Sequence, residues 1–279
     1  MSLENKTVVI TGSTGGIGKQ LVKYLVSAGA RLILVDRNRQ KAECLKNQFP
    51  NGDITLITAD MEDITSVNDA AEQIKLLHPD SLILNAGAYS IPRRITDIGF
   101  DNVFEINFVS PYFLVRELLP VLKKVVAVSS IAHNYSKIDE NNIDFRNKTA
   151  ASKVYGNAKR WLTLSLFGLF QNEKNASLAV THPGITFTGI TNHYPKLIFA
   201  IIKHPMKIIF MKPKTAALSV LEGLECETKE GEWIGPKFFN IWGKPKKRRL
   251  QTYSRKELDF CTKTAEQIYR SIKKVLKST

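Results

Sequence analysis

Short, continuous apolar segments recur along the first two thirds of the chain, and they constrain its fold more than any other feature. Each is four or five residues long and lacks the alternation of polar and apolar side chains. Such segments are typical of strands that are buried on both faces of a parallel sheet. The six segments are Thr7–Ile10, Leu32–Val35, Ile54–Thr58, Ser81–Leu84, Val125–Val128 and Ser177–Thr181.

Segments with helical spacing separate these strands. In Lys19–Ala28, for example, Leu21 and Leu25 share one face, and Gly29 would end the helix. Parallel strands joined by right-handed helical crossovers give a doubly wound sheet, so we expect an α/β fold of the Rossmann type. The other predicted helices are Arg39–Phe49, Ser66–Leu77, Phe104–Leu122 and Ala150–Phe170.

The last third of the chain departs from this alternation. The spacing there predicts a helix over Pro213–Leu224, a short strand within Gly231–Trp242, a charge run at Lys244–Arg249 and an amphipathic helix over Arg255–Lys277. A chain of 279 residues fits one large domain with terminal additions. We therefore expect one Rossmann-type domain over residues 1–242 and a basic C-terminal extension over residues 243–279.

The cysteines limit which chemistry and which cellular compartment we expect for this chain. Cys44, Cys226 and Cys261 are isolated from one another, which gives neither a disulfide framework nor the paired ligands of a metal site. The N-terminus enters a strand at Lys6 without a signal-peptide pattern, and no run of about 18 apolar residues predicts a spanning helix. We expect a cytoplasmic protein in a reducing compartment, with no bound metal.

Positive charge is concentrated in the C-terminal part of the chain. The formal net charge is +14, and from His193 onward 19 Lys and Arg residues stand against 8 Asp and Glu residues. This pattern favours either an anionic partner, such as a membrane surface or an acidic substrate, or a solvated surface that keeps the protein soluble. A nucleic acid is disfavoured because the basic tract belongs to no recognised nucleic-acid-reading module.

A glycine-rich turn lies between the first strand and the first helix. It reads T-G-S-T-G-G-I-G over Thr11–Gly18. Glycines allow the backbone to approach a pyrophosphate, and the helix N-terminus supplies N–H groups and the positive end of a dipole. A tight connection without a ligand is the alternative. The predicted binding residues are Gly12, Ser13, Thr14, Gly16, Ile17 and Gly18.

The end of the second strand bears on cofactor choice. Asp36 lies 18 residues after Gly18, where a carboxylate can bond both ribose hydroxyls of NAD and would repel a 2′-phosphate. Arg37 follows it directly and could instead pair with that phosphate. We expect NAD, with NADP as the alternative.

Further motifs follow in order along the chain. They are Asp60 after the third strand, Asn85–Ala86–Gly87 after the fourth, Asn107 in the long helix, Ser129–Ser130 after the fifth strand, the Y-x-x-x-K motif from Tyr155 to Lys159, and the P-G-x-x-x-T motif from Pro183 to Thr188. Together with the glycine turn, this order resembles that of the short-chain dehydrogenases/reductases over residues 6–188. The resemblance implies an NAD(P)-dependent oxidoreductase acting on an alcohol or carbonyl substrate.

The resemblance also assigns cofactor contacts to matching positions. It implies that Asp60 and Met61 flank the adenine and that Asn85, Ala86 and Gly87 line the side of the adenosine ribose. Pro183, Gly184, Ile185 and Thr188 would approach the nicotinamide end, where Ile185 and Thr188 would meet the carboxamide and a phosphate.

The chemistry centres on Tyr155 and Lys159. A tyrosine is a poor base near neutral pH, with a reference pKa of about 10, but a lysine ammonium one helical turn away favours the phenolate. Tyr155 would then act as the acid/base, and Lys159 would lower its pKa and bond the nicotinamide ribose. By the resemblance, Ser130 would hold the substrate oxygen and Asn107 a water on the proton path. A Tyr/Lys pair alone is more often ordinary helix surface.

The stretch between Ser130 and Tyr155 is longer than in many members of the family, and the added Ser136–Asp144 is polar. With the sequences S-S-I-A-H and Y-G-N-A-K it resembles the retinol-dehydrogenase-like subgroup, which implies a lipophilic substrate. The family also implies a lid over the substrate, here at residues 190–212, whose apolar side chains suit such a substrate.

Three further expectations concern partners and alternatives. The family often pairs subunits through the helices that hold Asn107 and Tyr155, which implies a homodimer or tetramer. The basic residues of the lid, of Lys244–Arg249 and of the terminal helix could rest on an anionic membrane, making the protein membrane-associated. The alternative to an enzyme is a non-catalytic dinucleotide-sensing regulatory module. Such a module usually lacks a catalytic residue, and this chain retains all four.

Overall fold

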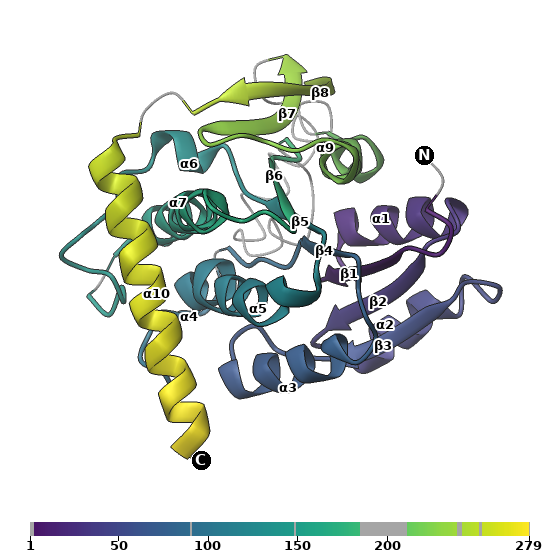
Figure 1. The fold of residues 1–279 in the computed structure, drawn as a ribbon, viewed down its shortest axis with the longest axis horizontal. Coiled ribbons are helices and arrows are strands. Elements are labelled where there is room, and N and C mark those ends of the chain that lie inside the picture. The colour runs from purple at the N-terminus through teal and green to yellow at the C-terminus, as the bar shows by residue number, and fades with distance from the viewer. Residues whose placement is uncertain are drawn as a thin grey trace, which may run out of the picture.

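A computed structural model of the chain describes residues 3–89, 91–147, 149–184, 211–238, 242–250 and 253–278. In this part of the chain eight strands form one sheet in the order β3-β2-β1-β4-β5-β6-β7-β8 (Figure 1). All neighbours are parallel except β7 and β8, which pair as an antiparallel hairpin. The strands are β1 (Thr7–Thr11), β2 (Arg31–Asp36), β3 (Ile54–Thr58), β4 (Ser81–Leu84), β5 (Lys124–Val128), β6 (Ser177–Thr181), β7 (Glu232–Phe238) and β8 (Trp242–Arg249).

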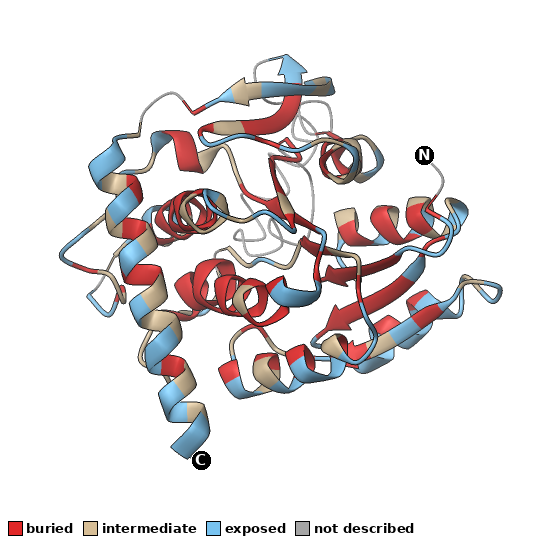
Figure 2. Cartoon of the chain, viewed as in Figure 1, coloured by how far each residue is buried: buried red, intermediate tan, exposed pale blue. Residues whose placement is uncertain are grey.

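Helices cover both faces of this sheet. On one face lie α3 (Ile64–Lys75), α5 (Ser110–Leu118) and α7 (Ala151–Phe170), with α10 (Arg255–Ser278) packed outside them. On the other face lie α1 (Gly16–Ser27), α2 (Arg39–Lys46) and α9 (Pro213–Glu225). Figure 2 shows the buried strands between the helix layers. Val9 faces one core while Val8 and Ile10 face the other, which explains the continuous apolar segments and confirms the doubly wound α/β fold.

The strand order places a crevice at the centre of the sheet. From β1 the chain builds β2 and β3 on one side, then crosses to β4, β5 and β6 on the other. The connections that leave β1 and β4 therefore run in opposite directions, which opens a crevice outside their carboxyl ends. The glycine turn follows β1, and Asn85 follows β4, so both lie at this switch point.

The predicted helix over Phe104–Leu122 is helical but not regular. It consists of α4 (Asn102–Phe104), a π-helical turn η1 (Glu105–Val109), α5 and a 3₁₀ turn η2 (Leu119–Val121). Wider turns of this kind occur often at functional sites, and Asn107 lies in this one. Apolar spacing alone does not distinguish a π turn from an α turn, so the sequence showed no sign of it.

The same π turn buries a carboxyl group. Glu105 is fully buried, and burial raises the pKa of its carboxyl group to about 8. Because the folded state holds this proton while the unfolded chain releases it, the free energy of unfolding should fall as pH rises from about 5 to 8.

Glu105→Gln should remove this fall. The free energies of unfolding of variant and wild type, measured by urea titration, should therefore diverge as pH rises. Glu43→Gln, at an exposed site on α2, is the control; equal pH profiles for wild type and Glu105→Gln would contradict the prediction.

The basic C-terminal residues are more ordered than a charge run. Lys244–Arg249, predicted as such a run, forms most of β8, so the expected boundary after residue 242 falls inside the β7–β8 hairpin. Pairing with β7 supplies hydrogen-bond partners for the backbone of β8, so this segment forms a strand although its side chains are mostly charged. The expected lid at residues 190–212 lies almost wholly outside the described residues. No described helix combines the length and hydropathy needed to cross a bilayer.

Helix α10 is attached to α5 and α7 by ion pairs and hydrogen bonds. Arg160 of α7 donates from Nε and Nη2 to the two carboxylate oxygens of Glu257, at 2.6 and 2.7 Å. Glu266 accepts from Tyr112 and lies 2.6 Å from Arg116, both on α5. These contacts, with the apolar face of α10, hold it against α5 and α7.

Candidate active site

The glycine turn has the close backbone approaches that its sequence predicts. Gly12 has a φ of +68°, and a Cβ there would lie 2.9 Å from Ala86 Cα. A Cβ on Gly18 would lie 2.4 Å from the Gly12 carbonyl oxygen, so the first turn of α1 packs directly on the loop. Side chains at these positions would push the loop out of shape.

Asp36 braces this turn from the end of β2. Its buried carboxylate accepts hydrogen bonds from Ser13 Oγ at 2.5 Å, and from the backbone N–H and the hydroxyl of Thr14 at 3.0 and 2.8 Å. Arg37 is exposed and lies 3.7 Å from the Asp60 carboxylate. The Asp36 carboxylate is therefore fixed in place, whereas Arg37 forms an ion pair at the surface.

The loop after β4 is tied to the same turn. Asn85 donates from Nδ2 to the carbonyl oxygens of Thr11 and Gly12, at 3.1 and 2.9 Å. The hydroxyl oxygen of Thr11 accepts the backbone N–H groups of Asn85 and Ala86. Polar contacts thus join the two strand ends that border the crevice.

A pocket of about 360 Å³ opens between these loops. The predicted cofactor residues of the glycine turn, of the end of β2 and of the loops after β3 and β4 all line it except Ser13, which is buried. Sequence reasoning missed Asn38 and Lys41, which enter the pocket from the start of α2; their spacing after Asp36 was the available signal. The lining residues are Gly12, Thr14–Gly18, Val35–Asn38, Lys41, Ala59–Met61, Asn85–Ala88 and Ile106.

Tyr155 and Ser130 meet next to this pocket. Tyr155 lies one turn into α7, and a hydrogen bond with Ser130 favours its phenolate, although burial dominates and raises the pKa of Tyr155 to about 12. Tyr89, on the loop after β4, packs edge-on against the Tyr155 ring at 5.2 Å between centroids. The phenol is thus held by a rigid helix and a neighbouring ring.

Lys159 lies one turn further along α7, and its ammonium is buried. Nζ donates to the Val128 carbonyl oxygen at 3.0 Å and lies 5.8 Å from the centre of the Tyr155 ring. Desolvation lowers the pKa of Lys159 to about 8. A lysine buried without a carboxylate partner costs stability, which is typical of functional rather than structural positions.

Asn107 reaches the same point from the π turn. Its Nδ2 donates to the carbonyl oxygens of Ala88 and Val103, while its buried Oδ1 has no hydrogen-bond partner among the described residues. A Cβ on Gly87 would lie 2.8 Å from Asn107 Oδ1 and 3.4 Å from Lys159 Nζ, so these two groups flank one small space.

The two serines after β5 have different environments. Ser129 is buried and hydrogen-bonds with His133 Nδ1 and Thr163 Oγ1, both at 2.9 Å. Ser130 hydrogen-bonds with Tyr155, and its choice as the functional serine stays a prediction. His133 stays neutral because burial lowers its pKa to about 3, and it packs against Trp233.

The P-G motif is only partly described. Pro183 and Gly184 follow β6 on the same edge of the sheet, and Gly184 has a φ of +83°. Ile185 and Thr188, predicted to meet the nicotinamide end, lie outside the described residues.

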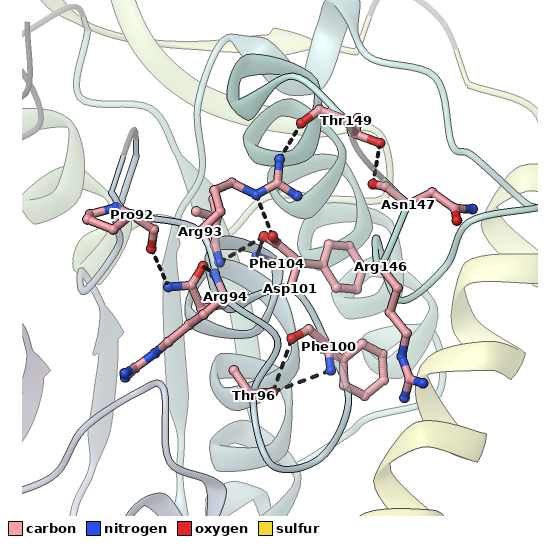
Figure 3. Close-up of polar contacts among 12 residues, drawn as sticks. Pro92, Arg93, Arg94, Thr96, Phe100, Asp101, Phe104, Arg146, Asn147 and Thr149 are labelled. Carbon is pink, nitrogen blue, oxygen red and sulfur yellow. Dashed lines mark hydrogen bonds and ion pairs between the residues drawn. The ribbon is translucent and has the colours of Figure 1, made fainter.

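The long stretch before Tyr155 packs against the loop after β4. Arg93 forms an ion pair with the buried Asp101 and donates to the Thr149 carbonyl oxygen (Figure 3). Arg146 donates to the Gly99 carbonyl oxygen at 2.6 Å, and Phe145 is buried against Phe104. The end of this stretch is therefore fastened to the loop after β4, just before the start of α7.

A doubly wound sheet with a glycine turn at its switch point defines a dinucleotide-binding α/β protein, and the Ser-Tyr-Lys cluster narrows the class further. A model of the short chain dehydrogenase family matches residues 6–142. Human retinol dehydrogenase 12 is 29% identical over 276 residues, covering 91% of this chain and 85% of that protein. The chain belongs to the short-chain dehydrogenase family and is similar to its retinol dehydrogenases.

Other relatives and solved structures agree on the fold. The short chain dehydrogenase resG of Aspergillus sclerotiorum is 29% identical over 227 residues, 66% of this chain and 63% of that protein; the chain thus spans less than two thirds of that relative. An uncharacterized protein of Mycobacterium paratuberculosis has a TM-score of 0.75 at 23% identity, covering 96% and 95% of the two chains. A family member of Burkholderia phymatum in complex with NAD has a TM-score of 0.59 at 16% identity, covering 81% and 87%.

Proposed function

We propose that this protein is a nicotinamide-dependent oxidoreductase that interconverts an alcohol and a carbonyl group, with Tyr155 as the acid/base. The observation that carries the proposal is the convergence of Tyr155, Ser130, Lys159 and Asn107 beside the pocket at the switch point. Each of these residue types is common, and Asn107 and Lys159 also brace the backbone, but the meeting of all four beside one crevice supports a catalytic role.

The described residues fit such a cofactor. The backbone of the glycine turn would receive the pyrophosphate at the N-terminus of α1, and Asp36 would bond the adenosine ribose. Asn107 Oδ1, which has no hydrogen-bond partner among the described residues and lies close to Gly87, could accept a hydrogen bond from a water or a ribose hydroxyl. A bound nicotinamide would supply or accept the hydride.

Proton transfer is the part performed by this chain. As the carbonyl carbon gains a hydride, its oxygen gains negative charge, and Tyr155 would donate the proton that neutralises it. Ser130 would donate a hydrogen bond to the same oxygen. Lys159, cationic below a pH of about 8, would stabilise the phenolate that remains. Water held by Asn107 would then relay a proton from solvent back to the Tyr155 phenolate.

Cofactor preference follows from Asp36. Titration should show at least about tenfold tighter binding of NADH than of NADPH, because a 2′-phosphate would meet this braced carboxylate. Asp36→Ser should narrow the difference, whereas the exposed Arg37→Gln should preserve it. A strong preference for NADPH that disappears in Arg37→Gln would show that the arginine decides the specificity.

The substrate class is proposed from similarity to retinol dehydrogenases, which suggests a lipophilic alcohol or aldehyde. Assays with a series of straight-chain aldehydes of increasing length should show kcat/KM rising with length. Highest activity with short polar carbonyl compounds would contradict this substrate class.

Pairing of subunits through the helices that hold Asn107 and Tyr155 stays a prediction. In the structure α10 lies against α5 and α7. A homodimer or tetramer built on these helices would have to use the surfaces that α10 leaves uncovered.

A further inference from the structure

The β7–β8 hairpin forms one edge of the sheet and carries a dense positive charge. Its two strands hold six basic residues and one acidic residue, Glu232. β8 is the outermost strand, and most of its side chains are exposed (Figure 2). The basic residues are Lys237, Lys244, Lys246, Lys247, Arg248 and Arg249.

Two large aromatic side chains are exposed at the end of this hairpin. Phe238 and Trp242 are cross-strand partners, and they are 54% and 38% exposed. Gly243, with a φ of +98°, leaves room for the ring, since a Cβ there would lie 2.8 Å from Phe238. Lys237 Nζ lies 5.4 Å from the centre of the Phe238 ring. Charge alone would keep a sheet edge soluble, but exposed aromatics do not serve that purpose.

The hairpin also projects past the rest of the sheet on the catalytic side. Thr181, the last residue of β6, pairs with Ile234, so β7 continues four residues further. Phe238 therefore lies past the end of β6 in the direction of the parallel strands, at their carboxyl edge. Ser130 and Gly184 follow β5 and β6 at this same carboxyl edge.

We propose that the β7–β8 hairpin docks the protein on anionic phospholipid bilayers, with Phe238 and Trp242 entering the interface and the lysines facing the headgroups. Aromatic rings favour the boundary between water and hydrocarbon, and clustered lysines favour anionic headgroups. A nucleic acid would explain the charge but is disfavoured by the paired aromatics at a narrow tip. Docking in this way turns the catalytic edge of the sheet toward the membrane, where a lipophilic substrate would dissolve.

Flotation of the full chain with vesicles tests the charge. The protein should bind more strongly to phosphatidylcholine vesicles that contain about 30% phosphatidylserine than to vesicles of pure phosphatidylcholine. Added salt should weaken this binding. The triple variant Lys244→Gln, Lys246→Gln, Lys247→Gln should lose affinity on the order of 100-fold. Three exposed lysines of α10 provide a control with equal change in charge: Lys256→Gln, Lys263→Gln and Lys274→Gln.

Tryptophan fluorescence tests the position of the tip. The chain has three tryptophans, and Trp161 and Trp233 are buried, so Trp242 is the one that vesicles can reach. Its emission should shift to shorter wavelength with anionic vesicles and become protected from acrylamide, and Trp242→Phe should abolish the shift.

Several results would overturn the proposal. These are equal binding to both kinds of vesicle, equal loss in the two triple variants, no spectral shift on binding, or preference for an oligonucleotide over vesicles. None of these measurements requires turnover, so they stand apart from the test of the proposed reaction.

Discussion

Tyr155→Phe is expected to reduce turnover by about 10²–10⁴-fold, the usual contribution of a positioned acid/base. The variant keeps the ring, its edge contact with Tyr89 and its place in α7, so cofactor affinity should stay within about threefold of wild type by fluorescence titration. Steady-state oxidation of NADH with an aldehyde measures the loss. Tyr135→Phe, which removes the hydroxyl of an exposed tyrosine on α6 (Ala132–Tyr135), should leave turnover unchanged.

The pH profile adds a second readout. Burial raises the pKa of Tyr155 to about 12 and lowers that of Lys159 to about 8. The lysine cation should therefore be lost first as pH rises, and reduction should weaken above a pH of about 8. Turnover of Tyr155→Phe equal to wild type would assign the proton to another group and remove the proposed mechanism.

Arg160→Met is expected to lower the free energy of unfolding by about 3–5 kcal/mol. Arg160 is 3% exposed, and it donates to Glu257 through two nitrogens and to the His133 carbonyl oxygen through Nη1. Its removal leaves the carboxylate of Glu257 and the carbonyl oxygen of His133 without this hydrogen-bond donor. Urea denaturation followed by circular dichroism measures the change.

Two further variants make this test specific. Arg255→Met breaks an exposed pair with Asp259 and should cost less than about 1 kcal/mol. The double variant Arg160→Met, Glu257→Met replaces the whole pair with apolar side chains and should recover part of the loss. Equal costs for Arg160→Met and Arg255→Met would show that the buried pair does not anchor α10.

The sheet could be predicted well because burial on both faces leaves a strong mark on a sequence. Three strands, Ile54–Thr58, Ser81–Leu84 and Ser177–Thr181, have the expected bounds. The positions of Gly12, Asn85 and Tyr155 around one crevice follow from strand order and short connections. These features depend on local pattern and on topology, both of which a single sequence records.

Other features depend on contacts that pattern does not record. Arg248 and its neighbours form a strand because β7 supplies hydrogen-bond partners, although their charge resembles that of a solvated run. Phe145 adopts a φ of +55°, rare for a bulky residue, because its ring is buried against Phe104. The π turn at Asn107 likewise leaves no periodic signal.

The packing of α10 has a consequence for how the chain folds. Tyr112 and Glu266 are 154 residues apart in the sequence, and Glu117 and Tyr269 are 152 apart, yet each pair is hydrogen-bonded. Contacts between such distant segments close large loops and slow folding. The helix that carries Tyr155 and Lys159 therefore reaches its final burial only when a remote segment docks, which couples completion of the active site to the slowest contacts of the fold.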